Sequence, residues 1–430
     1  MASLRKFIFI MLMGFIFLPI LQTTFHLIKV KPLSGAFSLT DDTTFTVAGW
    51  FSEKYQKHKE QYLKDTFGLR NLFIRSHNQI DYSIFRKINS GHILIGKNDE
   101  LFPEWYLGSY TGSNFKGTPY LKKVLDKMKY LQDTLAYLHK TLLLVITPSK
   151  VSFEPENIPV DYIKTDSTNY KACIKLLKED GLNYIDFNNY FIEQKYRSKY
   201  PLYNKDGNHW SFYGTCIAGD SIINKLEKIR KMKISHTDWK DNIVQEEASG
   251  DEVELEYDLN LLFPLKHTIM GHPQLKNNTD SSKTKPSVLI IGDSYINYLL
   301  DHYNFGANFS SFTFCYYFRT IFTSGNVNKG SISNFALKDA IKTNDIIIIE
   351  LTEANLYLLD FGFSDLVREI LPLDNSAEST FKERVLLMRH SMQDNSDLMA
   401  TIAEKAKKNK LPLDSMLILD AMWLVQHTKY

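Results

Sequence analysis

Short, continuously apolar runs alternate along this chain with longer segments of helical period. Residues 142–147 (LLLVIT), 287–292 (SVLIIG) and 345–351 (DIIIIEL) each contain four or five consecutive apolar residues. That pattern is typical of central parallel strands, whose two faces are both covered by helices. Residues 92–96 (HILIG) and 183–187 (NYIDF) predict two further short strands.

Helical periodicity fills most of the space between these runs. The clearest helix is predicted over residues 120–139, with a stripe spaced three and four apart at Leu121, Val124, Leu125, Met128, Leu131, Leu135 and Leu138. Further helices are predicted over most of 50–86, over 169–177, from about 215 to 230, and in the tail from Ser379. Residues 236–286 are polar and irregular, and predict a long loop or excursion. Strands that alternate with helices predict an α/β, doubly wound fold.

The N-terminus carries the longest uncharged apolar run of the chain. Arg5 and Lys6 precede residues 7–21 (FIFIMLMGFIFLPIL), which with the next residues approach the roughly 20 needed to span a bilayer. Basic residues on that side predict a cytoplasmic N-terminus. Without a small-x-small cleavage site after the run, a retained anchor is favoured over a cleaved signal peptide. The body is expected to be exported and soluble, and in a bacterial envelope to face the periplasm.

Composition narrows the class of protein. With 430 residues, 44% of them hydrophobic and 13% aromatic, the chain exceeds one average domain and is not disordered. Lys plus Arg is 51 and Asp plus Glu is 49, and no basic run with interleaved aromatics suggests a nucleic-acid partner. The three cysteines have no paired spacing, which favours buried apolar residues over disulfides. No nucleotide motif and no metal-ligand spacing occurs, so neither a cofactor nor a metal is predicted.

Polar groups with chemical potential follow two of the predicted strands and one turn. Ser294 follows the strand at 287–292, Asn355 follows the strand at 345–351, and Asp206 and His209 lie in the turn DGNHW before a helix. Ligands of open α/β sheets bind beyond the carboxyl ends of the strands. Ser294 is therefore a candidate nucleophile, His209 its base and Asp206 the acid that holds the imidazole. Asn355 and the Ser294 backbone N–H are candidate oxyanion donors.

Each candidate also has a structural interpretation. Gly-Asp-Ser after a strand is often only a turn, in which Asp293 or Ser294 caps the next helix. His209 can be a hydrogen-bonded, half-buried histidine, and Asn355 can be a helix cap. The combination is more informative than its parts, because all of these residues fall at predicted loop ends.

Four other charged residues are better explained structurally. Glu350 and Glu353 could flank the site, but surface or strand-end charge is the favoured interpretation. Arg70 and Arg75 could bind an acidic saccharide, but structural salt bridges are favoured.

Several of these motifs together resemble a known family. GDS after an apolar strand and the Asp-x-x-His of DGNHW resemble blocks I and V of the SGNH (GDSL-type) hydrolases, in inverted order. That order is similar to the AlgJ/AlgX-type alginate O-acetyltransferases. Further segments resemble this family: DTFGLRNLFIRSHNQIDYSIF (65–85), HILIGKNDELF (92–102, a hairpin), LLLVITPSK (142–150) and HWSFYG (209–214). The resemblance runs from about Trp50 to about Phe363.

The resemblance implies an SGNH-hydrolase-like three-layer sandwich with a central parallel sheet. It also implies acetylation of a polysaccharide acceptor through an acetyl-serine intermediate, with the acetyl group supplied by a membrane-bound acyltransferase. Two positions depart from the family pattern. Many members have Asp two residues before His, where this chain has Gly207; Asp206 has the spacing of ordinary SGNH hydrolases. Asn355 stands in LTEAN and not in the usual Gly-x-Asn.

The predicted organisation has four parts: a signal anchor or signal peptide (1–30), a linker and helical region (31–89, of which 31–48 is linker), the SGNH-like domain (90–370) and a helical extension (371–430). Three functions stay open. They are polysaccharide O-acetyltransferase, acetylesterase with the same triad, and a non-catalytic SGNH-like module that binds glycan or scaffolds an exopolysaccharide export complex. A separation of Ser294 Oγ and the His209 ring nitrogens above about 5 Å would count against both enzymes.

Overall fold

The computed structural model describes residues 2–35, 39–276 and 283–428. Parts of the predicted linker (36–38) and of the predicted loop (277–282) lie outside the described residues. The chain forms two compact units, which we describe separately. The N-terminal unit comprises Met1–Glu104, Lys205–Asn208 and Ser249–His267, and the sheet unit comprises Trp105–Asn204, His209–Ala248 and Thr268–Tyr430.

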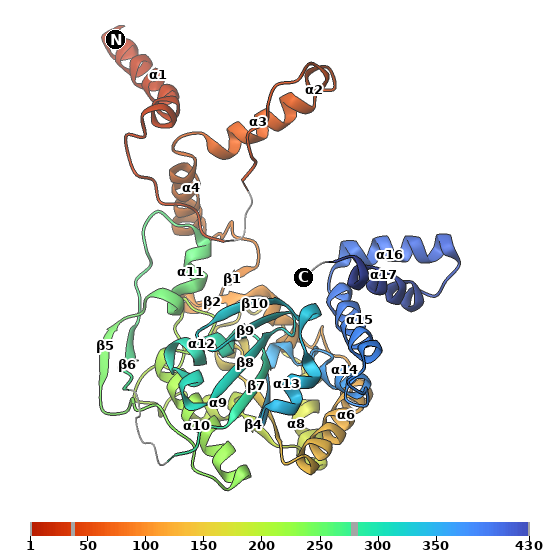
Figure 1. Ribbon diagram of the computed structural model, residues 1–430. Helices are drawn as coiled ribbons and strands as arrows, with labels where there is room; N and C mark the ends of the chain where they lie inside the picture. Colours follow the sequence, from red (N-terminus) through yellow and green to blue (C-terminus); the bar gives the residue numbers. More distant parts are fainter. Residues whose placement is uncertain (1, 36–38, 277–282, 429–430) are drawn as a thin grey trace. The chain divides into compact units, whose positions relative to one another are not determined.

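Among the described residues, the sheet unit is built on a seven-stranded sheet of order β10-β9-β8-β7-β11-β3-β4 (Figure 1). Its strands are β3 (Thr141–Thr147), β4 (Tyr184–Asp186), β7 (Ser287–Gly292), β8 (Ser311–Tyr316), β9 (Thr320–Thr323), β10 (Val327–Ser331) and β11 (Ile346–Thr352). β4, β3, β11, β7 and β8 are parallel, and β9 and β10 continue the sheet antiparallel. The three continuous apolar runs are thus neighbours in one parallel sheet, as predicted.

Helices cover both faces of this sheet. In β11, Ile347 and Ile349 face one hydrophobic core, and Ile346 and Ile348 face the other. The first core is closed by α6 (Thr118–Tyr137), α8 (Asn169–Asp180), α13 (Leu337–Thr343) and α14 (Phe363–Ile370), and the second by α9 (Phe187–Gln194), α10 (Phe212–Arg230) and α12 (Tyr295–His302). Each fully buried isoleucine stabilises the fold by about 1.5–3 kcal/mol. The predicted three-layer α/β/α sandwich is confirmed.

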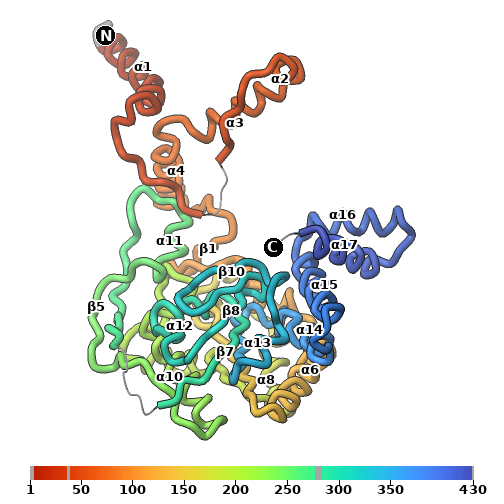
Figure 2. Tube along the Cα trace, viewed as in Figure 1, coloured from red at the N-terminus to blue at the C-terminus, as the bar shows by residue number. Residues whose placement is uncertain are grey.

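A helical group forms the end of the chain (Figure 2). It consists of α15 (Ala377–Gln393), α16 (Ser396–Asn409) and α17 (Leu413–His427), which bury a core of their own. Asn395 caps α16 by accepting a hydrogen bond from the Leu398 N–H. The helical tail predicted from Ser379 is therefore present.

The N-terminal unit is mainly helical. It contains α1 (Ala2–Phe25), α2 (Val47–Phe51), α3 (Lys54–Thr66), α4 (Arg70–Phe85) and α11 (Glu254–Leu259), and the antiparallel pair β1 (Ile93–Ile95) and β2 (Leu101–Pro103). Its small core joins the hairpin to α11 through Ile93, Leu101, Leu255 and Leu259. The helical region and the hairpin follow the sequence prediction.

Helix α1 is long and apolar enough to cross a membrane. Its segment Leu4–Phe25 has a mean hydropathy of 2.1, and none of the window that defines it is buried in protein. The helix predicted from Phe7 ends at Phe25, two residues before the predicted Leu27. The expectation that this run lies outside the globular body is confirmed.

The structure contains elements that the sequence pattern did not predict, among them β8, α9, α12, α13 and α14. Residues 236–286 are not only loop: β5 (Ile243–Glu247) and β6 (Ile269–Pro273) pair antiparallel, and α11 lies between them. β5 (IVQEE) is mostly exposed, so it lacks the apolar alternation that reveals a half-buried strand. The β9–β10 hairpin at the sheet edge was not predicted either, since it is short and β10 is largely exposed.

Candidate active site

The strands β7, β11 and β3 end side by side, so the polar residues that follow them meet at one edge of the sheet. Ser294 comes two residues after the end of β7 and occupies the N-cap position of α12 with helical backbone angles. Its side chain makes no capping hydrogen bond. The capping interpretation of Ser294 is therefore wrong, and its hydroxyl is directed elsewhere.

Ser294 Oγ lies 2.7 Å from His209 Nε2. His209 precedes α10, whose N-cap Ser211 accepts a hydrogen bond from the Gly214 N–H. The imidazole is only 8% exposed and is held between two aromatic rings. Tyr298 stacks on it at 4.4 Å between centroids, and Tyr295 meets it edge-on at 4.7 Å. These contacts restrict the ring to the orientation that points Nε2 at the serine.

A buried chain of hydroxyls fixes the Tyr295 ring in turn. Tyr203 donates a hydrogen bond to the Pro148 carbonyl at 2.7 Å, and its oxygen lies 2.9 Å from the Tyr295 hydroxyl. The chain links the loop after β3 to α12 next to the nucleophile candidate. Sequence reasoning missed both tyrosines, because nothing in their local pattern distinguishes them from the other core aromatics.

Asp293 ties two strand ends together beside Ser294. Its Oδ2 accepts hydrogen bonds from the Thr352 N–H (2.9 Å), the Thr352 hydroxyl (2.6 Å) and the Asn355 amide (2.9 Å). Its Oδ1 accepts a hydrogen bond from the Tyr295 N–H at 3.2 Å, at the first residue of α12. Of Asp293 and Ser294, the two residues predicted as possible caps of this helix, it is therefore Asp293 whose side chain caps it. Asn355, the predicted oxyanion donor, uses one of its two N–H groups on Asp293 and is 8% exposed.

A second buried carboxyl group lies behind this turn. Glu350 Oε2 accepts a hydrogen bond from the Asp293 N–H at 3.0 Å, and Oε1 accepts one from the Thr147 hydroxyl at 2.9 Å. Complete burial, and then the negative charge of Asp293, raise the pKa of Glu350 well above its usual range. The Glu350 carboxyl therefore keeps its proton to higher pH than an exposed glutamate does.

Glu353 is also buried, 4% exposed, and its Oε2 accepts hydrogen bonds from Ser149 (2.6 Å), Ser152 (2.8 Å) and Ser109 (3.2 Å). Burial raises its pKa, although the three serine hydroxyls act in the opposite direction. The surface-charge interpretation of Glu350 and Glu353 is wrong for both, and the strand-end placement is right. Both glutamates brace the loops that carry the site.

Glu350→Gln is expected to flatten the pH dependence of stability. A carboxyl whose folded pKa is raised stabilises the fold fully below its unfolded pKa, near 4.5, and loses that contribution as pH rises toward the folded pKa. The wild type should thus lose up to about 1.4 kcal/mol of unfolding free energy per pH unit in this window. Denaturant titrations at several pH values between 5 and 8 measure the slope. An unchanged slope in the variant would exclude Glu350 as the responsible group.

Tyr317 is a further side chain at the site that sequence reasoning missed. It follows β8 with a left-handed backbone (φ 49°), and its N–H donates to the Gly292 carbonyl at 2.8 Å. Burial raises the pKa of its phenol, while a side-chain hydrogen bond with Ser294 acts to lower it. No signal in the sequence singles this tyrosine out, since the sheet register alone brings it to the end of β7.

In the N-terminal unit, Asp206 is fully buried beneath α11. Its backbone carbonyl accepts hydrogen bonds from the Leu255 and Glu256 N–H groups at 3.1 and 3.3 Å. Its carboxylate lies within 4.8 Å of the side-chain donor atoms of Glu256 and His267. Spacing along the sequence did not predict this cluster, which comes from separate segments. The Glu256–His267 hydrogen bond (2.5 Å) already joins two of its three members.

Gly207 has a steric reason for lacking a side chain. A Cβ atom at this position would lie 2.4 Å from the Glu252 carbonyl oxygen, far inside van der Waals contact. The aspartate that many relatives carry at this position therefore cannot fit here without moving the Glu252 backbone. Asp206, one residue earlier, is buried without such a clash.

The chain was compared with curated proteins and with solved structures. A comparison with curated protein sequences yields no match. Solved structures that resemble the chain include the O-acetyltransferase domain of Pseudomonas putida AlgJ (14% identity, TM-score 0.40, 62% of this chain and 93% of that one). Pseudomonas aeruginosa AlgX (14%, 0.40, 64% and 67%) and Bacillus cereus PatB1 (11%, 0.37, 61% and 96%) are also similar.

The family model described as the SGNH hydrolase-like domain of acetyltransferase AlgX matches residues 93–311, which is half of the chain. The match includes both the His209 and the Ser294 segments. The resemblance inferred from the sequence motifs is confirmed, and this chain belongs to the AlgX family of SGNH hydrolase-like acetyltransferase domains.

Proposed function

We propose that this protein transfers acetyl groups to hydroxyls of a cell-envelope or secreted polysaccharide through an acetyl ester on Ser294. The observation that carries the proposal is the 2.7 Å contact of Ser294 Oγ with His209 Nε2 at the carboxyl end of β7. A serine within hydrogen-bond reach of an imidazole is the arrangement that activates a hydroxyl for attack on a carbonyl.

In the first half-reaction, Ser294 Oγ attacks the acetyl carbonyl carbon and its proton passes to His209 Nε2. The tetrahedral intermediate collapses, and the leaving group departs with that proton. In the second half-reaction, a sugar hydroxyl attacks the acetyl-serine and loses its proton to His209. Ser294 then leaves and regains the proton, so that the enzyme is restored and one acetyl group has moved.

Two further roles complete the proposed site. The Ser294 backbone N–H and the second N–H of the Asn355 amide donate to the oxyanion, at about 3 kcal/mol of barrier for each donor. The Asp206 carboxylate holds the tautomer in which His209 Nε2 is free to accept a proton. Burial of Asp206 and its position three residues before His209 support this role.

The cellular setting is part of the proposal. α1 anchors the protein in the inner membrane or directs its export, with the body in the periplasm. The acetyl donor is supplied by a membrane-bound acyltransferase, as the family resemblance implies.

Trapping the intermediate tests this function. The full chain in neutral detergent is mixed briefly with 4-nitrophenyl acetate, quenched in acid, digested and analysed by peptide mass spectrometry. We expect one acetyl group on the peptide that contains Ser294. Released nitrophenol should exceed free acetate when an acceptor polysaccharide is added, with the difference recovered as O-acetyl sugar.

Each other outcome identifies an alternative. A labelled Ser294 with release of acetate only, for every polysaccharide tried, favours an acetylesterase. Absence of label on Ser294 with donor consumption no faster than in buffer favours the non-catalytic glycan-binding or scaffold module.

A further inference from the structure

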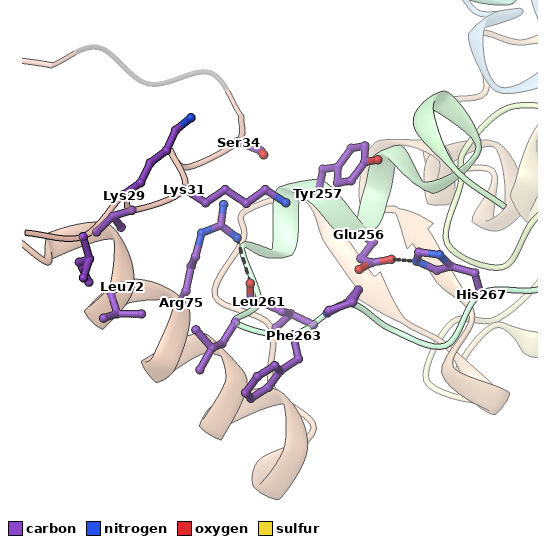
Figure 3. A pocket seen from close by; sticks show the side chains of 14 residues that line it. Lys29, Lys31, Ser34, Leu72, Arg75, Glu256, Tyr257, Leu261, Phe263 and His267 are labelled. Atoms are coloured by element: carbon purple, nitrogen blue, oxygen red, sulfur yellow. Dashed lines mark hydrogen bonds and ion pairs between the residues drawn. The ribbon is translucent and has the colours of Figure 1, made fainter. Parts of the chain in front are cut away.

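The N-terminal unit contains a cavity of about 390 Å³ whose lining does not include Ser294, His209 or Asp206 (Figure 3). Its walls come from the segment that follows α1, from α4, and from α11 with the loop after it. The lining is amphipathic: apolar side chains such as Ile28, Leu72 and Phe263 alternate with the basic residues Lys29, Lys31 and Arg75. A ligand for this cavity therefore carries both negative charge and apolar groups.

Arg75 is the central charged group of the cavity. It is 6% exposed, and its guanidinium donates to the Leu261 carbonyl at 2.9 Å and the Pro32 carbonyl at 2.6 Å (Figure 3). Its Nε–H is buried and has no hydrogen-bond partner among the described residues. Neutral carbonyls orient the guanidinium but leave its charge uncompensated, and buried charges are normally paired.

Among the described residues, no carboxylate forms an ion pair with Arg75. Arg70, one turn and a half earlier, has the ion pair expected from the sequence, with Asp65 at 3.8 Å. The expected salt bridge of Arg75 is not found among the described residues, and Lys29 and Lys31 have none there either. Glu256 lines the same cavity, but its two oxygens are bound by His267 at 2.5 Å and the Leu265 N–H at 3.0 Å.

The position of the cavity along the chain points to a membrane ligand. Ile28 and Lys29 follow the end of α1, Phe25, by three and four residues, so an extended connection spans only about 10–14 Å. The last turn of α1 contacts the turn before α4 through the hydrogen bond from the Gly68 N–H to Thr23 Oγ1, at 2.7 Å. If α1 crosses a bilayer, the cavity wall therefore lies at the depth of the lipid headgroups.

Exposed apolar residues surround the cavity at this level. Leu27, Ile28 and Phe263 are 64%, 51% and 65% exposed. Such residues suit contact with lipid better than contact with a hydrated saccharide. Figure 3 shows Lys31 extending beside Arg75 toward Tyr257, with the Lys29 ammonium at the outer side of the same segment.

We propose that this cavity binds the phosphate group of an anionic phospholipid headgroup, with Arg75 as its anchor and Lys31 and Lys29 at its mouth. Guanidinium groups bind phosphate through paired N–H donors, and lysines add charge at the membrane surface. The site would hold the N-terminal unit against the membrane that contains α1. This inference goes beyond acetyl transfer and does not depend on Ser294.

The test uses the full chain in neutral detergent. Binding of dioctanoyl phosphatidylglycerol, dioctanoyl phosphatidylcholine, inorganic phosphate and an oligouronate is measured by isothermal titration calorimetry. We expect saturable binding of phosphatidylglycerol at least tenfold tighter than of the other three. The double variant Lys29→Gln/Lys31→Gln should weaken it about tenfold or more, and Arg75→Gln further. The matched control Lys57→Gln/Lys64→Gln, two exposed lysines of α3 in the same unit, should bind like the wild type.

Several results would overturn the proposal. They are equal affinity for the two lipids, equal losses in the test and control doubles, or tighter binding of inorganic phosphate or the oligouronate than of phosphatidylglycerol. Arg75→Gln also removes the contacts with two carbonyl groups, and this loss can unfold the unit. The double variant Lys29→Gln/Lys31→Gln tests lipid binding without removing those contacts. Ser294→Ala should bind lipid like the wild type, so failure here and failure of the acetyl-transfer proposal are distinguishable.

Discussion

Ser294→Ala and His209→Ala are each expected to lower acetyl transfer by 10⁴-fold or more while the protein stays folded. Without Oγ no acetyl ester can form, and without the imidazole the hydroxyl keeps its proton at the moment of attack. Because the two groups act as one unit 2.7 Å apart, the double variant should be little worse than either single variant. Initial rates with 4-nitrophenyl acetate and an acceptor polysaccharide measure the losses.

The control must separate chemistry from folding. Ser310→Ala removes an exposed serine just before β8, at the opposite end of the sheet, and should keep wild-type activity. Thermal unfolding of Ser294→Ala should stay close to the wild type, since Ser294 is half-buried and its hydroxyl caps nothing. His209→Ala removes a buried ring that stacks on Tyr298, so its unfolding midpoint should be lower although the protein stays folded. Full activity of folded Ser294→Ala would remove the serine from the mechanism.

The centre of the sheet could be predicted because strands that are buried on both faces have consecutive apolar residues. Every residue of β3 and β11 is buried, so the centre of each strand is a run of four or five consecutive apolar residues. The stripe on α6 was equally clear, because one face of that helix packs on the sheet and the other meets solvent. Edge elements such as β5 and β10 show no comparable apolar pattern, since most of their side chains are exposed to water.

The site was predictable where chemistry selects a residue type within a local motif. Ser294 and His209 each stand in a short recognisable turn, and the fold brings them together. Glu350 and Tyr317 could not be assigned in this way. Their roles depend on the register between β11, β7 and β8, which places them beside Ser294 from distant parts of the chain. Likewise, nothing in the sequence around Arg75 indicates that it forms no ion pair with any carboxylate in the described part of the chain.

Asp206→Ala is expected to cost less than loss of the serine or the histidine. An acid in this role orients the imidazole and stabilises its protonated form, but it neither forms nor breaks a bond with the acetyl group. In a triad whose members have been removed one at a time, loss of the acid lowers the rate by about 10⁴-fold and loss of the nucleophile or base by about 10⁶-fold. The expected result is therefore a loss for Asp206→Ala that is clearly smaller than the loss for Ser294→Ala or His209→Ala in the same assay. A silent Asp206→Ala beside an inactive Ser294→Ala would instead define a Ser-His dyad.

Moving the acid one residue along the chain is expected to fail as a rescue. The double variant Asp206→Ala/Gly207→Asp has the spacing of many family members, yet its new Cβ would lie 2.4 Å from the Glu252 carbonyl oxygen. The backbone before α11 must move to admit it, so we expect no recovery of rate and a thermal unfolding midpoint below that of Asp206→Ala alone. Gly207→Ala carries the same clash without the carboxylate and serves as the matched control for the loss of stability. Recovery of activity in the double variant would show that the Glu252 backbone can move to admit a side chain at position 207. The steric explanation for Gly207 would then be wrong.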